Sequence, residues 1–494
     1  MLLLGIDVGT SSIKVAVVDA LTQECVASAQ FPDEESAIIS PKAGWAEQSP
    51  EMWWEHAKTA ILRANATGKY NPKDIGAIGI AYQMHGLVVV DKAQQTLRNA
   101  IIWCDSRAVE IGNKAFESIG PEKSLAHLLN SPGNFTASKL AWVKENEPAL
   151  YESIDKIMLP GDYVAMKLTG SITTSVSALS EGVFWDFQED QLSGDVLDYY
   201  QFEKSLIPTI NPVFSEHGTV QQAVAAELGL TAGIPVTYKS GDQPNNALSL
   251  NVLRPGEVAA TAGTSGVIYG VSDQLIYDPQ SRVNTFAHVN YGEAQKRLGV
   301  LLCINGTGSL NRWIKTIAGT GISYAEMNRL AAGIPVGSND LRVIPFGNGA
   351  ERMLGNKLVG SHFHNIDLNL HTKAHLFRGV QEGIAFAFRY GLDIMRESGM
   401  NPSIIRAGKA NLFLSDTFTE AFVNATHVPV ELYQNDGSVG AALGAGIGVK
   451  AFQSEEEAFT KSKKLQVVEP TAIDQYEPVY QEWKALLQQH LNKN

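Results

Sequence analysis

The feature that most constrains the fold of this chain is a short motif that occurs twice, about half a chain length apart. The segment "GIDVGTSSIKVAVVD" (5–19) aligns with "AATAGTSGVIYGVSD" (259–273), an offset of 254 residues from Gly9 to Gly263 in a chain of 494. Each copy has the pattern of a strand, a Gly-Thr-Ser turn and a second strand. A repeat at this spacing predicts two related domains that each begin with such a hairpin. The alternative is a pair of unrelated hairpins that both contain glycine.

Strand-like apolar runs alternate with longer helical patterns along the whole chain. "IGAIGIAYQ" (75–83) has the composition of a buried strand. "PEMWWEHAKTAILRANA" (50–66) has a helical pattern, with Ser49 as a candidate N-cap and Pro50 at the first helical position. A second long helix is predicted within 372–399. This alternation predicts an α/β fold, with one domain over residues 1–248 and the other over 249–494.

The composition indicates which kinds of partner the protein can bind and in which cellular compartment it is expected. With 39 basic and 52 acidic residues, the net charge of -13 disfavours duplex nucleic acid and anionic membranes as main partners. No window approaches 18 continuous apolar residues, and "MLLLGIDVGT" has the pattern of a buried first strand, without the features of a signal peptide. Three widely spaced cysteines, Cys25, Cys104 and Cys303, support neither a disulfide framework nor a zinc site. We therefore expect a cytoplasmic protein.

The two Gly-Thr-Ser turns have the chemistry of phosphate-binding loops. Such a turn exposes backbone N–H groups and hydroxyls that suit anionic oxygens, and two turns on facing domains could hold the phosphates of a nucleotide between them. Asp7 precedes the first turn, whereas Thr261 stands at the equivalent position before the second. A carboxylate beside phosphates requires a divalent cation between them. The asymmetry therefore predicts a Mg²⁺ site on the N-terminal side.

A second acidic candidate lies in the middle of the chain. "VTYKSGDQ" (236–243) has the pattern of a strand that ends in a Gly-Asp turn, and a helical pattern follows. Because α/β folds present ligand-binding groups at the carboxyl ends of strands, Asp242 is a candidate general base. The alternative is that Asp242 caps the following helix. The neighbouring amides of Gln243, Asn245 and Asn246 suit a polyhydroxylated ligand.

Two further segments of the first half contain polar residues at predicted strand ends. "AYQMHGLVVV" (81–90) contains Met84 and His85 between two strand-like runs, and His85 is either a substrate contact or an ordinary core or surface histidine. "IIWCDSR" (101–107) ends in Asp105 and Arg107, which either contact substrate or form a local ion pair.

Glycine-rich segments mark the second half. "RAGKANLF" (406–413) contains Gly408 in a predicted turn, and "NDGSVGAALGAGIG" (435–448) has glycines at helical spacing. Such glycines allow a helix to approach another backbone or a flat adenine ring, and tight helix packing alone is the alternative. The chain has no G-x-x-x-x-G-K-[ST] motif, which excludes a P-loop enzyme. No G-x-G-x-x-G opens the first helix, which disfavours a dinucleotide-binding domain.

Taken together, "GIDVGTSSIK", "SGDQPNNA" followed by "TAGTSG", and "NDGSVGAALGAG" resemble the motifs of the FGGY carbohydrate kinases, in the same order, from residue 2 to about 450. The resemblance implies two ribonuclease H-like domains of the actin/hexokinase-type ATPase fold flanking a central cleft. It also implies that the N-terminal domain binds the sugar and the C-terminal domain binds ATP. "GWAEQSPEMWWE" (44–55), "QMHG" (83–86) and "PGDYVAMKLTG" (160–170) are most similar to xylulokinases.

The resemblance also implies roles for individual residues. Asp242 matches the catalytic base, which also faces the sugar, and Asp7 matches the carboxylate associated with Mg²⁺. Met84 and His85 match the substrate-side turn, so that with Gln243 and Asp105 they form the predicted sugar site. The residues that match nucleotide-binding motifs are Gly9, Thr10, Ser11, Gly263, Thr264, Ser265, Gly408, Asp436 and Gly437.

The implied reaction is the ATP-dependent phosphorylation of the 5-hydroxyl of D-xylulose, and the implied assembly is a homodimer. Two positions depart from the family pattern. Arg406, Ala407 and Lys409 surround Gly408 where the family has a run of glycines, and Gln243 follows the base where xylulokinases often have Asn. The Asp-Gln pairing also occurs in glycerol kinases, but their Arg-Glu pair is absent from "QMHG". The alternatives are a kinase for ribulose, sedoheptulose or glycerol, or a non-kinase ATPase of the actin/chaperone type.

Overall fold

The computed structural model describes residues 1–319 and 321–493. Its N-terminal part is built on a five-stranded sheet with the order β13-β5-β1-β2-β3. β2 is antiparallel to both of its neighbours, whereas β5 and β13 run parallel to β1. The strands are β1 (Leu2–Val8), β2 (Ile13–Asp19), β3 (Cys25–Phe31), β5 (Ile75–Tyr82) and β13 (Val236–Gly241).

The C-terminal part repeats this sheet with one extra strand at each edge. Its order is β16-β17-β15-β14-β20-β21-β22, and β15 is antiparallel to both neighbours while β20 and β21 run parallel to β14. The strands are β14 (Glu257–Ala262), β15 (Gly266–Ser272), β16 (Asn284–Ala287), β17 (Leu298–Ile304), β20 (Ile404–Gly408), β21 (Val430–Tyr433) and β22 (Lys464–Val468). Five strands thus share order and direction with the first sheet. The repeat predicted from the sequence is confirmed, and the two hairpins are equivalent parts of two related domains.

Helices cover both faces of the first sheet, which explains why its central strands are apolar on both sides. One face, which carries Leu4 and Ile6, packs on α1 (Pro50–Ala66) and α6 (Pro160–Thr169). Ser49 caps α1 and Pro50 is its first residue, as the sequence predicted. The opposite face, which carries Leu3, packs on α15 (Gly437–Gly448).

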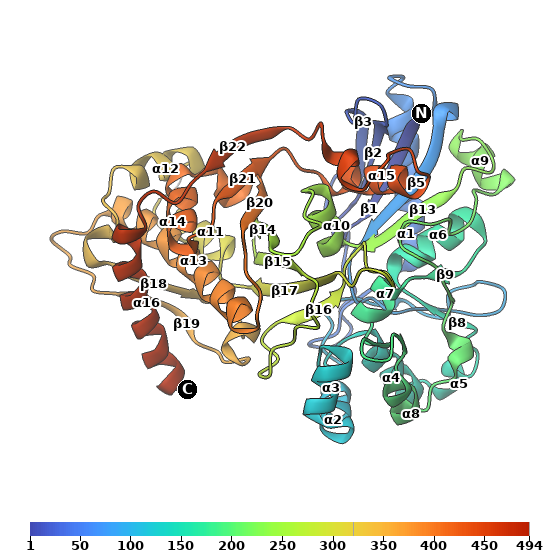
Figure 1. The fold of residues 1–494 in the computed structure, drawn as a ribbon, viewed down its shortest axis with the longest axis horizontal. Coiled ribbons are helices and arrows are strands. Elements are labelled where there is room, and N and C mark those ends of the chain that lie inside the picture. The colour runs from blue at the N-terminus through green and yellow to red at the C-terminus, as the bar shows by residue number, and fades with distance from the viewer. Residues whose placement is uncertain (320, 494) are drawn as a thin grey trace.

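The helix α15 belongs in space to the first sheet, although it lies more than 350 residues after β5 in the chain (Figure 1). A Cβ placed on Gly5 of β1 would lie 1.8 Å from the carbonyl oxygen of Ser438, and one on Gly79 of β5 would lie 2.0 Å from that of Ala441. Glycines on both elements therefore permit backbone-to-backbone contact. Of the two sequence interpretations of "NDGSVGAALGAGIG", the structure supports helix packing against another backbone.

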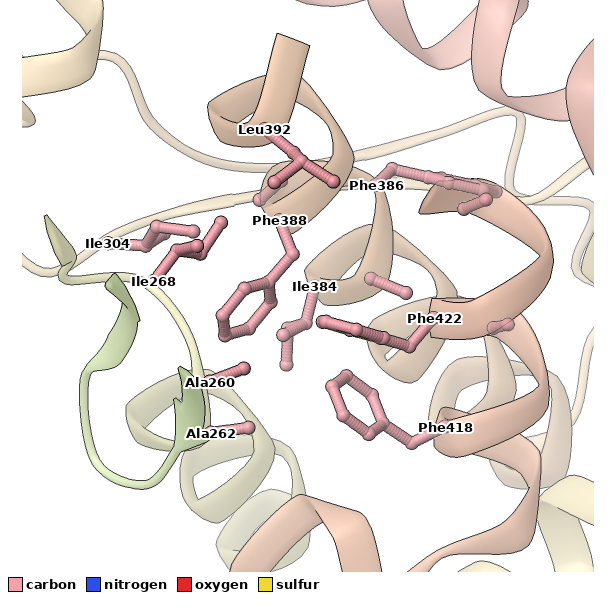
Figure 2. Packing of buried hydrophobic residues seen from close by; sticks show 14 of the residues in the cluster. Ala260, Ala262, Ile268, Ile304, Ile384, Phe386, Phe388, Leu392, Phe418 and Phe422 are labelled. Atoms are coloured by element: carbon pink, nitrogen blue, oxygen red, sulfur yellow. The ribbon is translucent and has the colours of Figure 1, made fainter. Parts of the chain in front are cut away.

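The core of the second domain lies between its sheet and three helices, α13 (Lys373–Glu397), α14 (Asp416–Thr426) and α16 (Ile473–Lys493). Figure 2 shows Phe388 directed from α13 toward Ile268 and Ala260 of the sheet, and Phe422 of α14 close by. The rings of Phe388 and Phe422 meet edge to face with 5.2 Å between their centroids. The helix predicted within 372–399 corresponds to α13.

A smaller α/β region lies between β5 and β13 and contacts the second sheet. Ser177 Oγ donates a hydrogen bond to the carbonyl oxygen of Ala287 (2.9 Å), and Ser180 Oγ accepts one from the Ala287 amide (2.9 Å). These contacts join α7 (Val176–Glu181) to β16 (Figure 1). The other elements of this region are β6 (Val88–Val90), β7 (Ala100–Ile101), α2 (Val109–Ile119), α3 (Pro121–Leu128), α4 (Thr136–Asn146), α5 (Pro148–Tyr151), β8 (Lys156–Met158), β9 (Thr173–Thr174), β10 (Trp185–Asp186), β11 (Gln191–Leu192), α8 (Gly194–Tyr200), β12 (Thr209–Ile210) and α9 (Gln222–Leu228).

The remaining elements are β4 (Glu47–Gln48), α10 (Asp242–Ser249), α11 (Gly308–Ile317), α12 (Tyr324–Ala332), β18 (Arg342–Phe346) and β19 (Gly360–His364). Within residues 1–319 and 321–493, none of the helices combines the length and apolar character needed to span a bilayer. The three cysteines are free thiols.

Candidate functional site

The first Gly-Thr-Ser turn joins β1 to β2 and is held by a polar network from the surrounding loops. Trp103 Nε1 donates to Thr10 Oγ1 (3.0 Å), and Thr10 Oγ1 donates to Gln83 Oε1 (3.2 Å). Gln48 Nε2 donates to the carbonyl oxygen of Thr10 (2.8 Å), and Gln48 Oε1 accepts from Gln83 Nε2 (3.0 Å). The Thr10 hydroxyl is thus oriented by two side chains, Trp103 and Gln83. Sequence reasoning missed the supporting roles of Gln48 and Trp103.

The second Gly-Thr-Ser turn joins β14 to β15 and is held by the start of α11. The amides of Gly308 and Ser309 donate to the carbonyl oxygens of Gly263 and Thr264 (both 3.0 Å), and Thr307 Oγ1 lies 3.2 Å from both oxygens. The N-terminus of α11 therefore lies against this turn. The first two N–H groups of this helix are used to hold the turn, so α11 fixes the shape of the turn.

A cavity of about 370 Å³ opens beside the second turn. Its wall combines apolar groups with amide side chains, the composition typical of a small-molecule pocket. Gly408 lies outside this wall, at the end of β20, but the segment that follows it contributes three residues. The lining residues are Ala262, Gly263, Thr264, Gly308, Asn311, Arg312, Tyr324, Ala325, Asn328, Asn411, Leu412 and Leu414. The sequence motifs did not predict Asn311 of α11 or Asn328 of α12, which both line the cavity.

Asp7 lies near the end of β1, on the sheet face that α15 covers. A Cβ placed on Gly437, the first residue of α15, would lie 2.6 Å from Asp7 Oδ2, so glycine is required there for the carboxylate to approach the helix N-terminus. Burial, together with the charge of Asp436, raises the pKa of Asp7 to about 6. Asp436 itself caps α15, since its Oδ1 accepts from the Ser438 amide (2.8 Å) and hydroxyl (2.6 Å).

Asp242 is the first residue of α10, directly after β13. The N-cap of this helix is Gly241, which supplies no side-chain cap, so the structure does not support the alternative that Asp242 is the capping residue. Burial, together with the charge of Asp7, raises the pKa of Asp242 to about 7. The carboxylate of Asp7 on β1 thus lies close enough to Asp242 on α10 to influence its ionisation.

The turn that contains Met84 and His85 adjoins Asp242. A Cβ on Gly241 would lie 2.6 Å from Met84 Cγ. His85 has a positive φ of 62°, and its Nδ1 lies 3.0 Å from the carbonyl oxygen of Glu181. Because a carbonyl can only accept, Nδ1 carries the proton and donates it, and Nε2 of the neutral ring is left as an acceptor. Burial and the charge of Lys139 lower the pKa of His85 to about 3, which keeps the ring neutral.

Asp105 forms the local ion pair that the sequence left open. Its carboxylate accepts from Arg107 Nε (2.9 Å) and Nη2 (2.7 Å) and from the Ala46 amide (2.6 Å), and it is fully buried. Arg107 in turn stacks on the Trp45 ring, 3.8 Å from its centroid. With its oxygens occupied by these groups, Asp105 supports the wall of the site and has no free face toward a ligand.

The amides that follow Asp242 bind protein groups, not an open site. Asn245 Nδ2 donates to the carbonyl oxygen of Gly437 (2.9 Å), and Asn246 Oδ1 accepts from Asn435 Nδ2 (2.9 Å). The described hydrogen bonds of these two amides are thus with the protein, and a contact with a sugar stays a prediction. Both tie α10 to the chain around the N-terminus of α15, which holds Asp242 and Asp7 in one arrangement.

Two related domains of this topology, each with a Gly-Thr-Ser hairpin, define the actin/hexokinase-type ATPase fold. The structure of xylulose kinase from Rhodospirillum rubrum superposes with a TM-score of 0.89 and is 25% identical, covering 99% of both chains. The structure of Plasmodium falciparum glycerol kinase with ADP also gives a TM-score of 0.89, at 19% identity over 99% of this chain and 98% of that chain. At 19% identity, the similarity to the glycerol kinase structure shows only that the two chains share a fold.

Sequence comparison identifies the family within this class. Residues 2–249 match the N-terminal domain model of the FGGY family of carbohydrate kinases, and residues 258–449 match the C-terminal domain model. The chain belongs to the FGGY family and is a carbohydrate kinase. Among curated relatives, the xylulose kinase of Bacillus subtilis is 28% identical over 98% of this chain and 97% of the relative, and that of Staphylococcus epidermidis is 30% identical over 98% and 96%.

Proposed function

We propose that this kinase transfers the γ-phosphoryl group of ATP to the 5-hydroxyl of D-xylulose and produces D-xylulose 5-phosphate. The observation that carries the proposal is a carboxylate with a pKa near neutrality, Asp242, at the strand-to-helix junction beside the turn of Met84 and His85. The similarity to xylulose kinases over nearly the whole chain supports the choice of sugar. Glycerol is the weaker choice, because the "QMHG" segment lacks the Arg-Glu pair of glycerol kinases, although Asp242-Gln243 also occurs in them.

In this proposal residues 1–248 bind the sugar and residues 249–494 bind the nucleotide. Asp242 accepts the proton of the attacking hydroxyl, and a pKa near the working pH suits that task. Nε2 of His85 accepts a hydrogen bond from another sugar hydroxyl, and Met84 packs against the apolar face of the carbon chain. Gln243 lies on the same first turn of α10 and completes this side of the site.

The nucleotide is proposed to lie across the two hairpins, with its adenosine in the cavity beside Thr264. The amides and hydroxyls of Gly9, Thr10, Ser11, Gly263, Thr264 and Ser265 supply the phosphate-binding groups. Asp436 and Gly437 act indirectly, by fixing the N-terminus of α15 against Asp7. Gly408 contributes by directing the following segment, Asn411–Leu414, to the cavity wall.

The side chains present fit a bound Mg²⁺. Burial and a neighbouring carboxylate raise the pKa of both acids: Asp436 acts on Asp7, and Asp7 acts on Asp242. A divalent cation relieves such repulsion. No group of three His, Cys, Asp or Glu residues in the described part of the chain could hold a metal alone. This agrees with the way Mg²⁺ is usually bound, by one or two carboxylates together with water and substrate phosphates. When bound, the ion neutralises the phosphates as charge develops on them.

The substrate assignment is tested by a panel of ketoses and polyols at saturating MgATP. We expect kcat/KM for D-xylulose to exceed that for ribulose, sedoheptulose and glycerol by at least about 10-fold, the discrimination of about 1.4 kcal/mol that one additional well-placed hydrogen bond supplies. A coupled ADP-release assay measures each value. A higher kcat/KM for any other sugar or polyol would replace xylulose as the substrate. ATP turnover that no sugar stimulates would contradict the kinase proposal itself.

The pKa of Asp242 predicts the acid limb of the pH profile. As pH falls below about 7, Asp242 gains a proton and can no longer act as a base. We therefore expect log kcat/KM for the sugar to rise with a slope near 1 below about pH 6, to bend near pH 7 and to level off above about pH 8. The profile is measured at constant ionic strength with saturating MgATP. A flat profile over this range would rule out Asp242 as the titrating base.

A further inference from the structure

Glu181, the last residue of α7, has a buried carboxyl group beside the proposed sugar site. Its side chain is 2% exposed, and neither carboxyl oxygen forms a hydrogen bond with well-formed geometry among the described residues. Other buried carboxylates of the chain have such partners: Asp162 pairs with Lys239, Glu382 pairs with Arg378, and Glu351 accepts from two backbone amides. The carboxyl of Glu181 is therefore an exception that the packing of the protein does not account for.

The position of this carboxyl is given by three neighbours that belong to the proposed sugar site. Oε2 lies 3.9 Å from Nδ1 of His85, whose proton is already donated to the backbone of Glu181. A Cβ placed on Gly241, the residue before Asp242, would lie 3.0 Å from the same oxygen. The charge of Asp242 raises the pKa of Glu181, which shows that the two carboxyls are near each other. The Tyr82 hydroxyl and the backbone N–H of His85 lie near enough to oppose that increase, but neither forms a well-formed hydrogen bond with the carboxyl.

At this buried position the carboxyl of Glu181 is suited to act as a neutral hydrogen-bonding group. Burial raises the pKa of Glu181 well above its ordinary value, which favours the protonated form. The protonated carboxyl has one O–H donor and free acceptor sites. Leaving such a group without partners destabilises the folded protein. A protein can retain such an unsatisfied group when a bound ligand supplies the missing partners. Strained or unsatisfied groups of this kind concentrate at binding sites.

We propose that Glu181 is a sugar-binding residue, whose carboxyl forms hydrogen bonds with a hydroxyl of the bound ketose close to the one that Asp242 deprotonates. This inference rests on the proposed function, because it uses the same site. A polyhydroxylated sugar matches the carboxyl well, since each hydroxyl both donates and accepts. A site built to bind a hydroxyl also discriminates against analogues that lack it, because the buried partner is then left unpaired. Glu181 therefore contributes to the choice of substrate.

The experiment compares Glu181→Ala and Glu181→Gln with Glu189→Gln, an exposed Glu on the following turn, as control. We expect the Tm of the free Glu181→Ala protein to equal or exceed that of the unmodified protein, because an unpaired buried carboxyl is removed. Its kcat/KM for the sugar should fall about 10–100-fold, mainly through KM, the loss expected for one or two hydrogen bonds. Gln retains a donor and an acceptor and should recover most of this loss. Glu189→Gln should change neither value.

A series of monodeoxy analogues of the preferred sugar then tests the contact directly. For one analogue, the chain with Glu181 and the Glu181→Ala variant should have nearly equal kcat/KM, because the hydroxyl that Glu181 binds is absent from that analogue. If the Tm of Glu181→Ala falls by more than about 5 °C, or if its kcat/KM is reduced by the same factor for every analogue, Glu181 has a structural role and the proposal is overturned. Failure of the proposed function is a distinct result, since the unmodified protein would then fail to turn over any sugar of the panel.

Discussion

Replacement of Asp242 by Ala is expected to lower kcat by about 10²–10⁴, the usual contribution of a general base. Asp242 is the first residue of α10, and burial raises its pKa to about 7, so its ionised form is not stabilised by the fold. The substitution should therefore leave the fold intact. The measurement is steady-state turnover with sugar and MgATP, accompanied by the Tm of each protein.

The matched control for this experiment is Asp416→Ala. Asp416 is also the first residue of a helix, α14, but it is exposed and its helix packs in the core of the second domain. We expect its turnover to remain within about 2-fold of the unmodified value, since surface substitutions rarely change stability by more than about 0.5 kcal/mol. Asp242→Asn, which keeps the shape but not the basicity, should resemble Asp242→Ala. Turnover near that of the unmodified protein in either Asp242 variant would contradict the assignment.

The second large effect is expected at Gly79, where the first sheet meets α15. A Cβ on this residue would lie 2.0 Å from the carbonyl oxygen and 2.8 Å from the carbonyl carbon of Ala441. Because these are backbone atoms, Gly79→Ala cannot be accommodated by a rotamer change and must displace the helix. We expect the free energy of unfolding to fall by about 3 kcal/mol, the upper end of the usual cost of overpacking. Activity should fall as well, since α15 positions Gly437 against Asp7.

Gly76→Ala is the control on the same strand, β5. A Cβ there would meet the sulfur of Met1 at 2.6 Å, which is the far end of a flexible and largely exposed side chain that can move aside. We expect a loss below about 1 kcal/mol and unchanged kinetics. Thermal and urea unfolding, followed for both variants, give the comparison. Equal stability of the two variants would show that α15 does not pack on β5 as tightly as described.

Much of the architecture could be predicted because its signals are local. The apolar run "LLLGIDV", the Gly-Thr-Ser turn that follows it and the next strand pattern specify a hairpin within about fifteen residues. The second copy of this pattern then predicted a second domain, and the equivalent strand order of the two sheets agrees with it. Ser49 and Pro50 predicted the start of α1 for the same reason, since capping depends only on neighbouring residues.

Residues whose roles depend on distant neighbours were predicted less well. Asp105 was a candidate ligand until the structure placed it against Arg107 and Ala46. Asn245 had the right chemistry for a sugar, but its amide binds Gly437, which lies 192 residues further along the chain. Glu181 was not predicted at all. The only signal is a Glu within an otherwise weakly polar helical segment, and such a residue is ordinarily exposed.

The sequence by itself determined the two hairpins, the α/β class and the identity of the acidic residues that could perform catalysis, because turn chemistry and periodicity act over a few residues. Only the tertiary structure decided that α15 closes the first sheet, that the charge of Asp7 raises the pKa of Asp242, and that the buried carboxyl of Glu181 has no well-formed hydrogen bond among the described residues. These properties arise from burial and from Coulomb interactions between groups far apart in the chain. Neither is specified until the chain has folded and the low-dielectric surroundings of each charge exist.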